Sequence, residues 1–296
     1  MIINPKEIKS SELHAYMLGA IAPRPIAFAS TIDKQGNPNL SPFSFFNAFG
    51  SNPPLVIFSP ALRGRDAVAK NTLENLREID EVVINIVNYD MVQQVSLAST
   101  EYPKGVNEFV KAGFTAIPSD LIRPFRVKES PVQMECKVRE IIQTGVKGGA
   151  ANLVICEIIL MHINDDILDE SGKIDPKKID QVARMGGNWY TRAAKGLFEV
   201  PKPLSTPGIG IDQLPAAIRN SKILSGNDLG MLGNVEQLPA ENEIKEFGMQ
   251  QDVSNLLKAL ENDKAGCETA IHLAARQLLK EKKVLEALKL LMLIIK

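Results

Sequence analysis

Short runs of apolar and β-branched residues recur along the first two thirds of the chain. The runs at 55–59 (LVIFS) and 82–87 (VVINIV) are almost wholly apolar, which is typical of strands covered on both faces. Residues 132–138 (VQMECKV) alternate apolar with polar positions and predict a half-buried strand, and a longer strand is expected over 152–163. A polar, glycine-containing turn at 33–37 separates two further runs and predicts a hairpin.

Helical patterns interrupt these strands only briefly, at about 66–79 and 90–98, and Asp90 is positioned to act as the N-cap of the second. Six or so strands with few and short helices fit a barrel better than a sheet of alternating strands and helices. The pattern therefore predicts a mainly β fold with some α, of the barrel type.

The composition changes near residue 200, which divides the chain into three segments. Residues 1–200 hold the predicted barrel. Residues 201–245 are rich in proline, glycine and asparagine and are expected to be an irregular segment that wraps a surface or links domains. Residues 246–296 predict a C-terminal extension of two or three amphipathic helices, packed together or onto the barrel. Because an exposed apolar stripe of that size would favour aggregation, we expect it to be buried against the barrel or a second subunit.

The composition also narrows the classes of partner. The 296 residues are 45% hydrophobic and 23% charged with a formal net charge of -1, so no long-range field attracts nucleic acid. The first residues resemble no secretory signal, and the apolar run at 290–295 is too short to span a membrane. The 3 cysteines form no CxxC pair and fit reduced thiols, so a cytoplasmic location is expected. The 3 histidines lie at no ligand spacing from a cysteine, and no metal site is expected.

The strand arm at 41–47 is the first feature that points to chemistry. The common cofactor and hydrolase motifs are absent: no GxGxxG follows a strand, and neither GxxxxGK[ST] nor GxSxG occurs. The arm combines hydroxyls, aromatic rings and an amide, namely Ser41, Phe43, Ser44, Phe45, Phe46 and Asn47. A flavin ring requires this mixture, because apolar surface suits its xylene end and hydrogen bonds suit its pyrimidine edge. A strand with one core face and one solvent face would give the same pattern.

A second cluster places cations and hydrogen-bond donors around the start of the helix expected at 66–79. Its members are Arg63, Arg65, Lys70, Asn71 and Thr72. Guanidinium and ammonium groups, together with the amides of a helix N-terminus, are suited to a phosphate dianion. A solvated helix face is the alternative interpretation of the same residues.

Two further features are compatible with a site but define none alone. His162 ends an apolar strand, where a lone histidine is more often a hydrogen-bonded structural residue than a catalytic one. At 184–190 (RMGGNWY), paired glycines between Arg184 and Trp189 permit close approach of the backbone to a ligand or a partner. Such glycines also occur in ordinary loops.

Taken in order, these segments resemble the flavin reductase-like family with the FMN-binding split barrel, the group that includes flavoredoxin. The resemblance covers roughly residues 10–198, and it is specific because separate segments agree in order and spacing. The matching segments are 24–33 (RPIAFASTID), 36–60, 70–76 (KNTLENL), 82–88 (VVINIVN), 98–109 (ASTEYPKGVNEF), 171–175 (SGKID) and 184–192 (RMGGNWYTR).

The resemblance implies a homodimeric split β-barrel with FMN bound non-covalently at or near the subunit interface, and a C-terminal helical appendage outside the family pattern. Lys104 and His162 would approach the flavin ring and are the catalytic candidates. Arg63, Lys70 and Thr72 would hold the phosphate. All residues implied to bind the cofactor are Thr31, Asn39, Ser41, Ser44, Phe45, Phe46, Asn47, Ser59, Arg63, Lys70, Thr72, Arg184, Gly186, Gly187 and Tyr190.

The resemblance implies one of two functions. The first is an NAD(P)H-dependent flavin reductase that transfers hydride to FMN, with NADH or NADPH as a transient electron donor. Such transfer needs stacked rings and exclusion of water but no dedicated acid or base, which suits a chain poor in histidine. The alternative is a non-enzymatic FMN electron carrier of the flavoredoxin type, reduced by a protein partner, with an electron-acceptor protein as a further partner. A third interpretation keeps the barrel only as a dimerisation or binding module.

Overall fold

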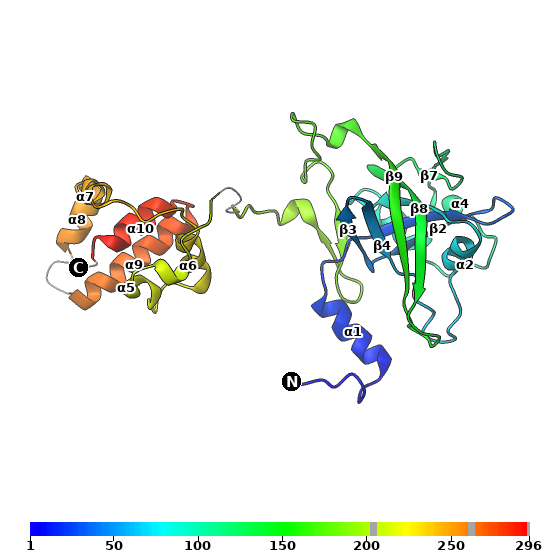
Figure 1. The fold of residues 1–296 in the computed structure, drawn as a ribbon, viewed down its shortest axis with the longest axis horizontal. Helices are drawn as coiled ribbons and strands as arrows, with labels where there is room; N and C mark the ends of the chain where they lie inside the picture. Colours follow the sequence, from blue (N-terminus) through cyan, green and yellow to red (C-terminus); the bar gives the residue numbers. More distant parts are fainter. Residues whose placement is uncertain (202–205, 260–263, 295–296) are drawn as a thin grey trace. The chain divides into compact units, whose positions relative to one another are not determined.

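The computed structural model describes residues 1–201, 206–259 and 264–294. These residues fold into two compact units, Met1–Phe198 and Glu199–Lys296, each with a hydrophobic core of its own (Figure 1). The first unit is built mainly on strands and the second on helices. Among the described residues, no helix combines the length and the apolar character that crossing a membrane requires.

A seven-stranded antiparallel sheet forms the first unit, in the order β2-β1-β5-β8-β9-β4-β3. Its strands are β1 (Ala27–Ile32), β2 (Pro38–Phe43), β3 (Phe46–Ser51), β4 (Pro54–Phe58), β5 (Glu81–Ile86), β8 (Val132–Gln143) and β9 (Asn152–Ile163). Two small sheets are formed by β6 (Ala116–Ile117) with β7 (Arg126–Val127) and by β10 (Val182–Arg184) with β11 (Tyr190–Arg192). The helices of this unit are α1 (Ser10–Ala20), α2 (Asn71–Glu78), α3 (Val92–Ala98) and α4 (Glu108–Ala112).

The connection between β2 and β3 closes this sheet into a split barrel. The two strands lie at opposite ends of the sheet order, yet only Ser44 and Phe45 join them. So short a link spans at most about 11 Å, and the sheet must curl until its two edges are neighbours. Irregularities in the β8–β9 ladder after Glu135 and Val138 add to the bend. Within the described residues β2 and β3 form no ladder with each other, which leaves the barrel split along a seam.

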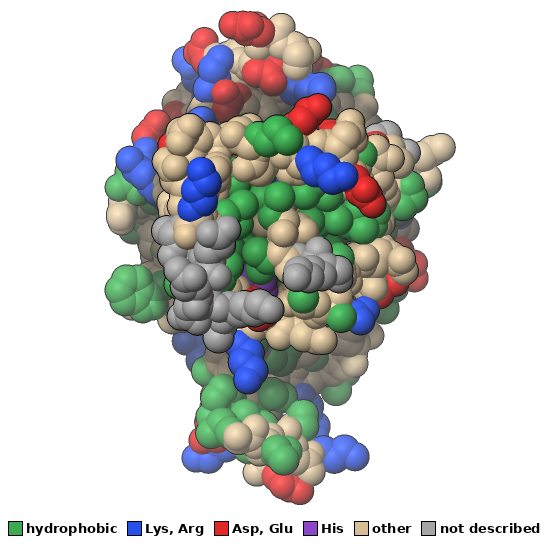
Figure 2. Space-filling model, turned by 90° about the vertical axis from the view of Figure 1, so that its left-hand side faces the viewer, with side chains coloured by type: hydrophobic (Ala, Val, Ile, Leu, Met, Phe, Trp, Pro, Cys, Tyr) green, Lys and Arg blue, Asp and Glu red, His purple; other side chains and the backbone are tan. Residues whose placement is uncertain are grey.

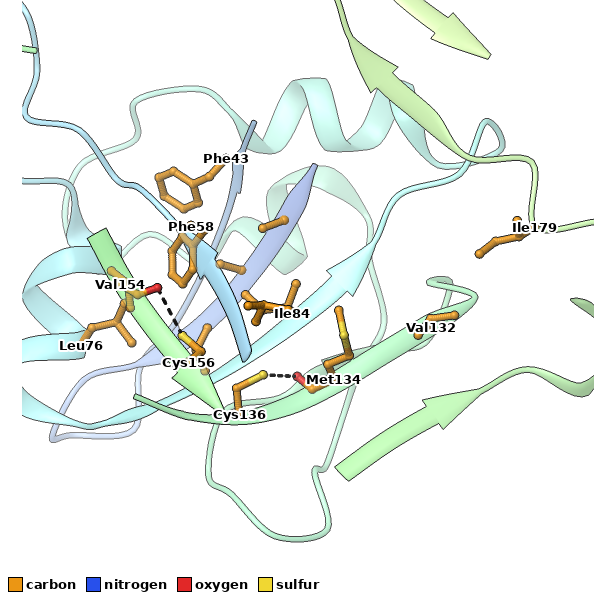
Figure 3. Packing of buried hydrophobic residues seen from close by; sticks show 14 of the residues in the cluster. Phe43, Phe58, Leu76, Ile84, Val132, Met134, Cys136, Val154, Cys156 and Ile179 are labelled. Atoms are coloured by element: carbon orange, nitrogen blue, oxygen red, sulfur yellow. Dashed lines mark hydrogen bonds between the residues drawn. The ribbon is translucent and has the colours of Figure 1, made fainter. Parts of the chain in front are cut away.

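Apolar side chains of the strands fill the barrel. Phe43 of β2, Phe58 of β4 and Ile84 of β5 are buried in one cluster (Figure 3). Cys136 and Cys156 lie in the same cluster with free thiols. Burial raises the pKa of Cys156 to about 12, so its thiol stays protonated and behaves as a small apolar group.

Two expectations about the strands need correction. The strand arm expected up to Asn47 is broken at Ser44 and Phe45, where the chain crosses the seam. The strand at 132–138 is buried on both faces from Val132 to Cys136 rather than half-buried. The reason is that the loop after β6 covers the polar face, with the backbone N–H of Asp120 donating to the carboxylate of Glu135 at 2.8 Å.

The helix starts also differ from the expectation. α2 begins at Asn71 instead of near residue 66, because the chain forms a turn in which Ala67 has a φ of 57°. Met91, not Asp90, is the residue before α3, and no side chain caps that helix. Both helices are therefore shorter than their apolar patterns suggest.

The second unit consists of short helices around one apolar cluster. They are α5 (Ala216–Arg219), α6 (Gly226–Gly233), α7 (Glu241–Gly248), α8 (Gln251–Ala259), α9 (Lys264–Lys280) and α10 (Val284–Met292). Partly buried apolar residues, among them Val253, Leu256 and Leu257 of α8, border this cluster. Figure 2 shows apolar side chains gathered between charged ones on one face of this unit. The C-terminal helices pack with one another around this cluster, so many of their apolar side chains are buried within the second unit itself.

The segment 201–245 is not irregular throughout, because it contains α5, α6 and the start of α7. The side chain of Ser225 caps α6, and Ile218 of α5 is fully buried in the apolar cluster. Its glycines allow close packing, since a Cβ at Gly208 would lie 2.8 Å from the carbonyl oxygen of Gly233. Helices this short show no clear period in sequence, and their turn residues dominate the composition.

His272 lies buried in the second unit with an unpaired ring nitrogen. The Oγ of Ser221 lies 2.6 Å from Nδ1 of His272 and accepts the backbone N–H groups of Ile223 and Leu224. The serine proton is therefore donated to Nδ1, which leaves the imidazole neutral with its own proton on Nε2. Nε2 has no hydrogen-bond partner among the described residues, and burial lowers the pKa of His272.

We expect the second unit to lose stability as the pH falls. The unfolded chain protonates His272 near its ordinary pKa of about 6.5, whereas the folded unit resists protonation, so the unfolded state binds more protons below that pH. Hydrogen-exchange protection of α9 should decrease between about pH 7.5 and about pH 5.5. His272→Asn, which keeps an acceptor for Ser221, should lose most of this dependence, and His14→Asn, at an exposed position, should retain it. The same pH dependence in both variants would contradict the assignment.

Candidate functional site

A cavity of about 370 Å³ opens beside β2. Its volume is within the usual range of small-molecule sites. One wall comes from residues 63–74, which include the start of α2, and the other from residues 98–104, the loop that leads from α3 towards α4. The structure brings together here a subset of the residues predicted to form the site, namely Asn39, Ser41, Arg63, Lys70, Thr72 and Lys104.

Lys70 is the cation of this cavity that has no fixed counter-ion. Its ammonium lies 5.2 Å from the centre of the Phe43 ring, and no ion pair or side-chain hydrogen bond to it occurs in the described part of the chain. Burial lowers the pKa of Lys70; Glu101 opposes this effect and Arg63 adds to it. A half-buried ammonium in such surroundings favours the binding of an anion.

The other cations are held by carboxylates. Nη2 of Arg65 lies 2.6 Å from Oε2 of Glu101, and Nη1 of Arg63 lies 3.9 Å from the same oxygen. Nζ of Lys104 lies 2.7 Å from Oε2 of Glu74. The hydrogen bond from Lys104 to Glu74 raises the pKa of Lys104. These cations are thus already paired.

Further polar groups lie beside the cations. Nδ2 of Asn39 donates to Oγ1 of Thr72 at 2.8 Å. The carboxyl group of Glu108 accepts the backbone N–H of Leu40 at 3.0 Å, and burial raises the pKa of Glu108. Hydroxyl, amide and carboxyl groups can bind a polyol, and the cations can bind a phosphate on it. Sequence reasoning missed Glu108, because a glutamate at the start of a short helix gives no signal that it points to the interior.

Thr31 and Ser59 lie outside the lining of this cavity. Thr31 is fully buried, and its Oγ1 accepts from Nδ2 of Asn75 at 3.1 Å, so it has a structural partner. The backbone N–H of Ser59 donates to the carbonyl oxygen of Phe45 at 2.9 Å, which places Ser59 at the seam. The Oγ of Ser59 is buried and has no hydrogen-bond partner among the described residues.

The residues of the broken strand arm lie along the seam. Phe46 packs against the barrel core, and Asn47 is exposed. Phe45 is half-buried and contacts His14 edge to face, with 6.0 Å between the ring centres. Ser44, Phe45, Phe46 and Asn47 therefore border the seam, while the cavity beside β2 is lined by other residues.

Arg184 and Tyr190 line a different cavity, of about 480 Å³, beside β10 and β11. The guanidinium carbon of Arg184 lies 4.7 Å from the centre of the Tyr190 ring. Gly187 has a φ of 57°, and a Cβ at Gly186 would lie 3.5 Å from Cα of Gly19, so this turn is closely packed. The first turn of α3 lines this second cavity, whereas the end of α3 lines the first.

His162 lines neither of these two cavities and is held by Glu135. Nε2 of His162 lies 2.7 Å from Oε1 of Glu135. The backbone N–H of Asp120 donates to the same Oε1 and that of Leu121 to Oε2, both at 2.8 Å. Burial alone would raise the pKa of Glu135, but these hydrogen bonds outweigh it and the pKa is lowered. Asp120, Glu135 and His162 place ligand atoms within 4.8 Å of one another, but Arg126 lies 4.0 Å from Glu135 and its charge opposes a cation there.

The first unit matches known proteins. A family model described as a flavin reductase like domain matches residues 18–181. An uncharacterised protein of Halalkalibacterium halodurans is 35% identical over 205 residues, which are 69% of this chain and 97% of that protein. The similarity thus covers nearly the whole of that relative.

Solved structures give the same picture. Nitrilotriacetate monooxygenase component B from Bacillus cereus is 28% identical with a TM-score of 0.63, and the match covers 68% of this chain and 98% of that one. The 2-nitrobenzoate 2-nitroreductase of Pseudomonas fluorescens is 25% identical with a TM-score of 0.62, covering 71% and 100%. Flavoredoxin of Desulfovibrio vulgaris (Miyazaki F) shares the fold, with 22% identity, a TM-score of 0.53 and coverage of 62% and 92%.

If the half-buried ammonium of Lys70 serves to bind a ligand, it should lower the stability of the ligand-free protein. Lys70→Met removes the half-buried ammonium and keeps an unbranched side chain. We expect the ligand-free first unit to unfold about 1–4 °C higher, which corresponds to about 0.5–1 kcal/mol, because its surroundings disfavour the charge. Lys104→Met, which removes an exposed and paired ammonium, should bring no such gain in calorimetry. A lower unfolding temperature for Lys70→Met would show that the ammonium stabilises the fold.

Proposed function

The chain belongs to the flavin reductase-like family, and from this premise we propose that it binds FMN in the cavity beside β2 and passes electrons to it from NADH or NADPH. It is a flavin-binding oxidoreductase with the split-barrel fold. The observation that supports FMN is the half-buried, unpaired ammonium of Lys70 next to groups that can bind a polyol. A ribityl chain that ends in a phosphate has this combination of hydroxyls and negative charge.

Different residues of the cavity would bind different parts of the cofactor. Lys70 and Arg63 would neutralise the phosphate dianion, because ionised groups form the strongest hydrogen bonds to phosphate. Asn39, Thr72 and Glu108 would bind the ribityl hydroxyls. The donor set therefore fits a flavin mononucleotide.

We propose that the flavin ring is contacted from the seam. Ser59 offers a buried hydroxyl without a partner, and Phe45 offers a half-buried aromatic surface beside it. FMN supplies the redox chemistry, since its ring accepts a hydride from a reduced nicotinamide. The protein would contribute orientation and exclusion of water, and Lys104 in the cavity lining would supply an exposed cation.

A second copy of the chain would complete the site. Alternate residues of β9, namely Ile159, Met161 and Ile163, share one face and are 37%, 45% and 39% exposed. An apolar stripe of this kind marks a surface for association, and two-fold pairing is the commonest solution. The side chain of His162 projects from the opposite face of β9, where Glu135 holds it at 2.7 Å, so His162 is not part of this stripe.

Flavin binding can be tested by colour and affinity. The protein incubated with excess FMN and desalted should absorb near roughly 370 and 450 nm. Lys70→Met should weaken FMN binding about 5- to 150-fold in a fluorescence titration, because a charged hydrogen bond to phosphate is lost. Riboflavin, which has no phosphate, should bind both proteins equally. Equal FMN affinity of variant and wild type would remove the phosphate assignment, and a wild type that binds no FMN in the titration would refute flavin binding.

The electron donor can be tested by steady-state kinetics. With FMN and an artificial electron acceptor, the protein should oxidise NADH or NADPH at about 1 per second or faster. Lys70→Met should raise the FMN concentration needed for half-maximal turnover, because it affects the binding of FMN and not the nicotinamide. Bound FMN without oxidation of either nucleotide would exclude the reductase and favour an electron carrier reduced by a protein partner.

A further inference from the structure

Ion pairs made by Glu101 and by Lys104 connect the opposite walls of the cavity beside β2. Glu101, in the 98–104 wall, pairs with Arg65 at 2.6 Å and lies 3.9 Å from Arg63, and both arginines belong to the other wall. In the second connection the 98–104 wall supplies the cation: Lys104 pairs with Glu74 of α2 at 2.7 Å. Each wall therefore supplies cations to a carboxylate of the other, and the two walls are held together by charge.

The carboxylate of Glu101 lies beside Arg63 and Arg65, where the phosphate of a ligand would have to bind. A guanidinium binds a carboxylate and a phosphate through the same N–H groups. Asp66 lies 3.2 Å from Nε of Arg63 and Glu101 lies 3.9 Å from its Nη1, so a phosphate that reaches Nη1 competes with Glu101. The competing pair is easily displaced, because Arg65 is 67% and Glu101 is 49% exposed, and exposed pairs are weak. Lys70 has no such competitor within 4 Å among the described residues, which gives an incoming dianion a first contact.

We propose that Glu101 is an internal competitor of the FMN phosphate: it pairs with Arg63 and Arg65 in the flavin-free protein and is displaced when FMN binds. This inference rests on the proposed function of the cavity. Displacement of Glu101 releases one of the two connections between the walls, whereas the Lys104–Glu74 pair remains. When FMN leaves, Glu101 returns to the arginines and favours its release. Glu101 therefore lowers the affinity to that of an exchangeable flavin.

The test is Glu101→Gln, which keeps the shape of the side chain and removes its charge. We expect the dissociation constant for FMN to fall about three- to tenfold and FMN release to slow, because Asp66 is then the one carboxylate among the described residues that still pairs with the two arginines. Riboflavin affinity should stay within about twofold, since riboflavin has no phosphate to compete with Glu101. Glu140→Gln is the matched control: it makes the same change of charge at an exposed position of β8 outside the cavity and should alter neither flavin.

Two outcomes would overturn the inference while leaving the proposed function intact. Unchanged or weaker FMN binding by Glu101→Gln, with a wild type that binds FMN, would show that no competition exists. Equal tightening of FMN and riboflavin would show that the variant merely loosens the loop. A wild type that takes up no FMN would instead refute the proposed function, and the inference with it.

Discussion

The two-residue link between β2 and β3 is the constraint on which the first unit depends. Ser44 and Phe45 must bring the two outermost strands of the sheet together, so the sheet closes around its apolar core. Among the described residues β2 pairs with no strand other than β1, and α2, α3 and α4 contact it. Helix ends and loops cover a strand edge less completely than another strand would, and the cavity lies in this region. The same link thus accounts for both the barrel and the position of the site.

The cavity beside β2 contains buried ionisable groups whose charged forms are disfavoured by their surroundings. Burial lowers the pKa of Lys70 and raises that of Glu108, so both charges are disfavoured in the same small space. Elsewhere in the first unit, buried Glu81 is paired with Lys137 at 2.7 Å, and buried Arg24 donates to the carbonyl oxygens of Leu18 and Met185. Groups with shifted pKa values that gather in a concave site are characteristic of ligand binding, because a ligand can supply the charges and hydrogen bonds that these groups lack in the protein alone.

The sequence predicts those parts of the fold and site that depend on neighbours along the chain. Strands 55–59 and 82–87 are recognisable from their apolar runs, and Arg63, Lys70 and Thr72 meet in one cavity because they lie within one turn and the helix after it. Residue placement over long distances could not be predicted. A buried threonine such as Thr31 has the same local pattern whether it faces a ligand or Asn75, and only the fold places Arg184 in a separate cavity.

The two units should respond to acid in a definite order. In the barrel, burial alone would raise the pKa of Glu81 and of Glu135, but ion pairs and hydrogen bonds outweigh it and both values are lowered. Their contribution to stability is therefore complete above the ordinary glutamate pKa of about 4.3 and is lost only as the pH falls below it. In the second unit, His272 lowers the stability at a higher pH, as the pH falls below about 6.5. In that range the unfolded state protonates the histidine while the folded state does not. Mild acid thus weakens the helical unit while the buried carboxylates of the barrel remain ionised.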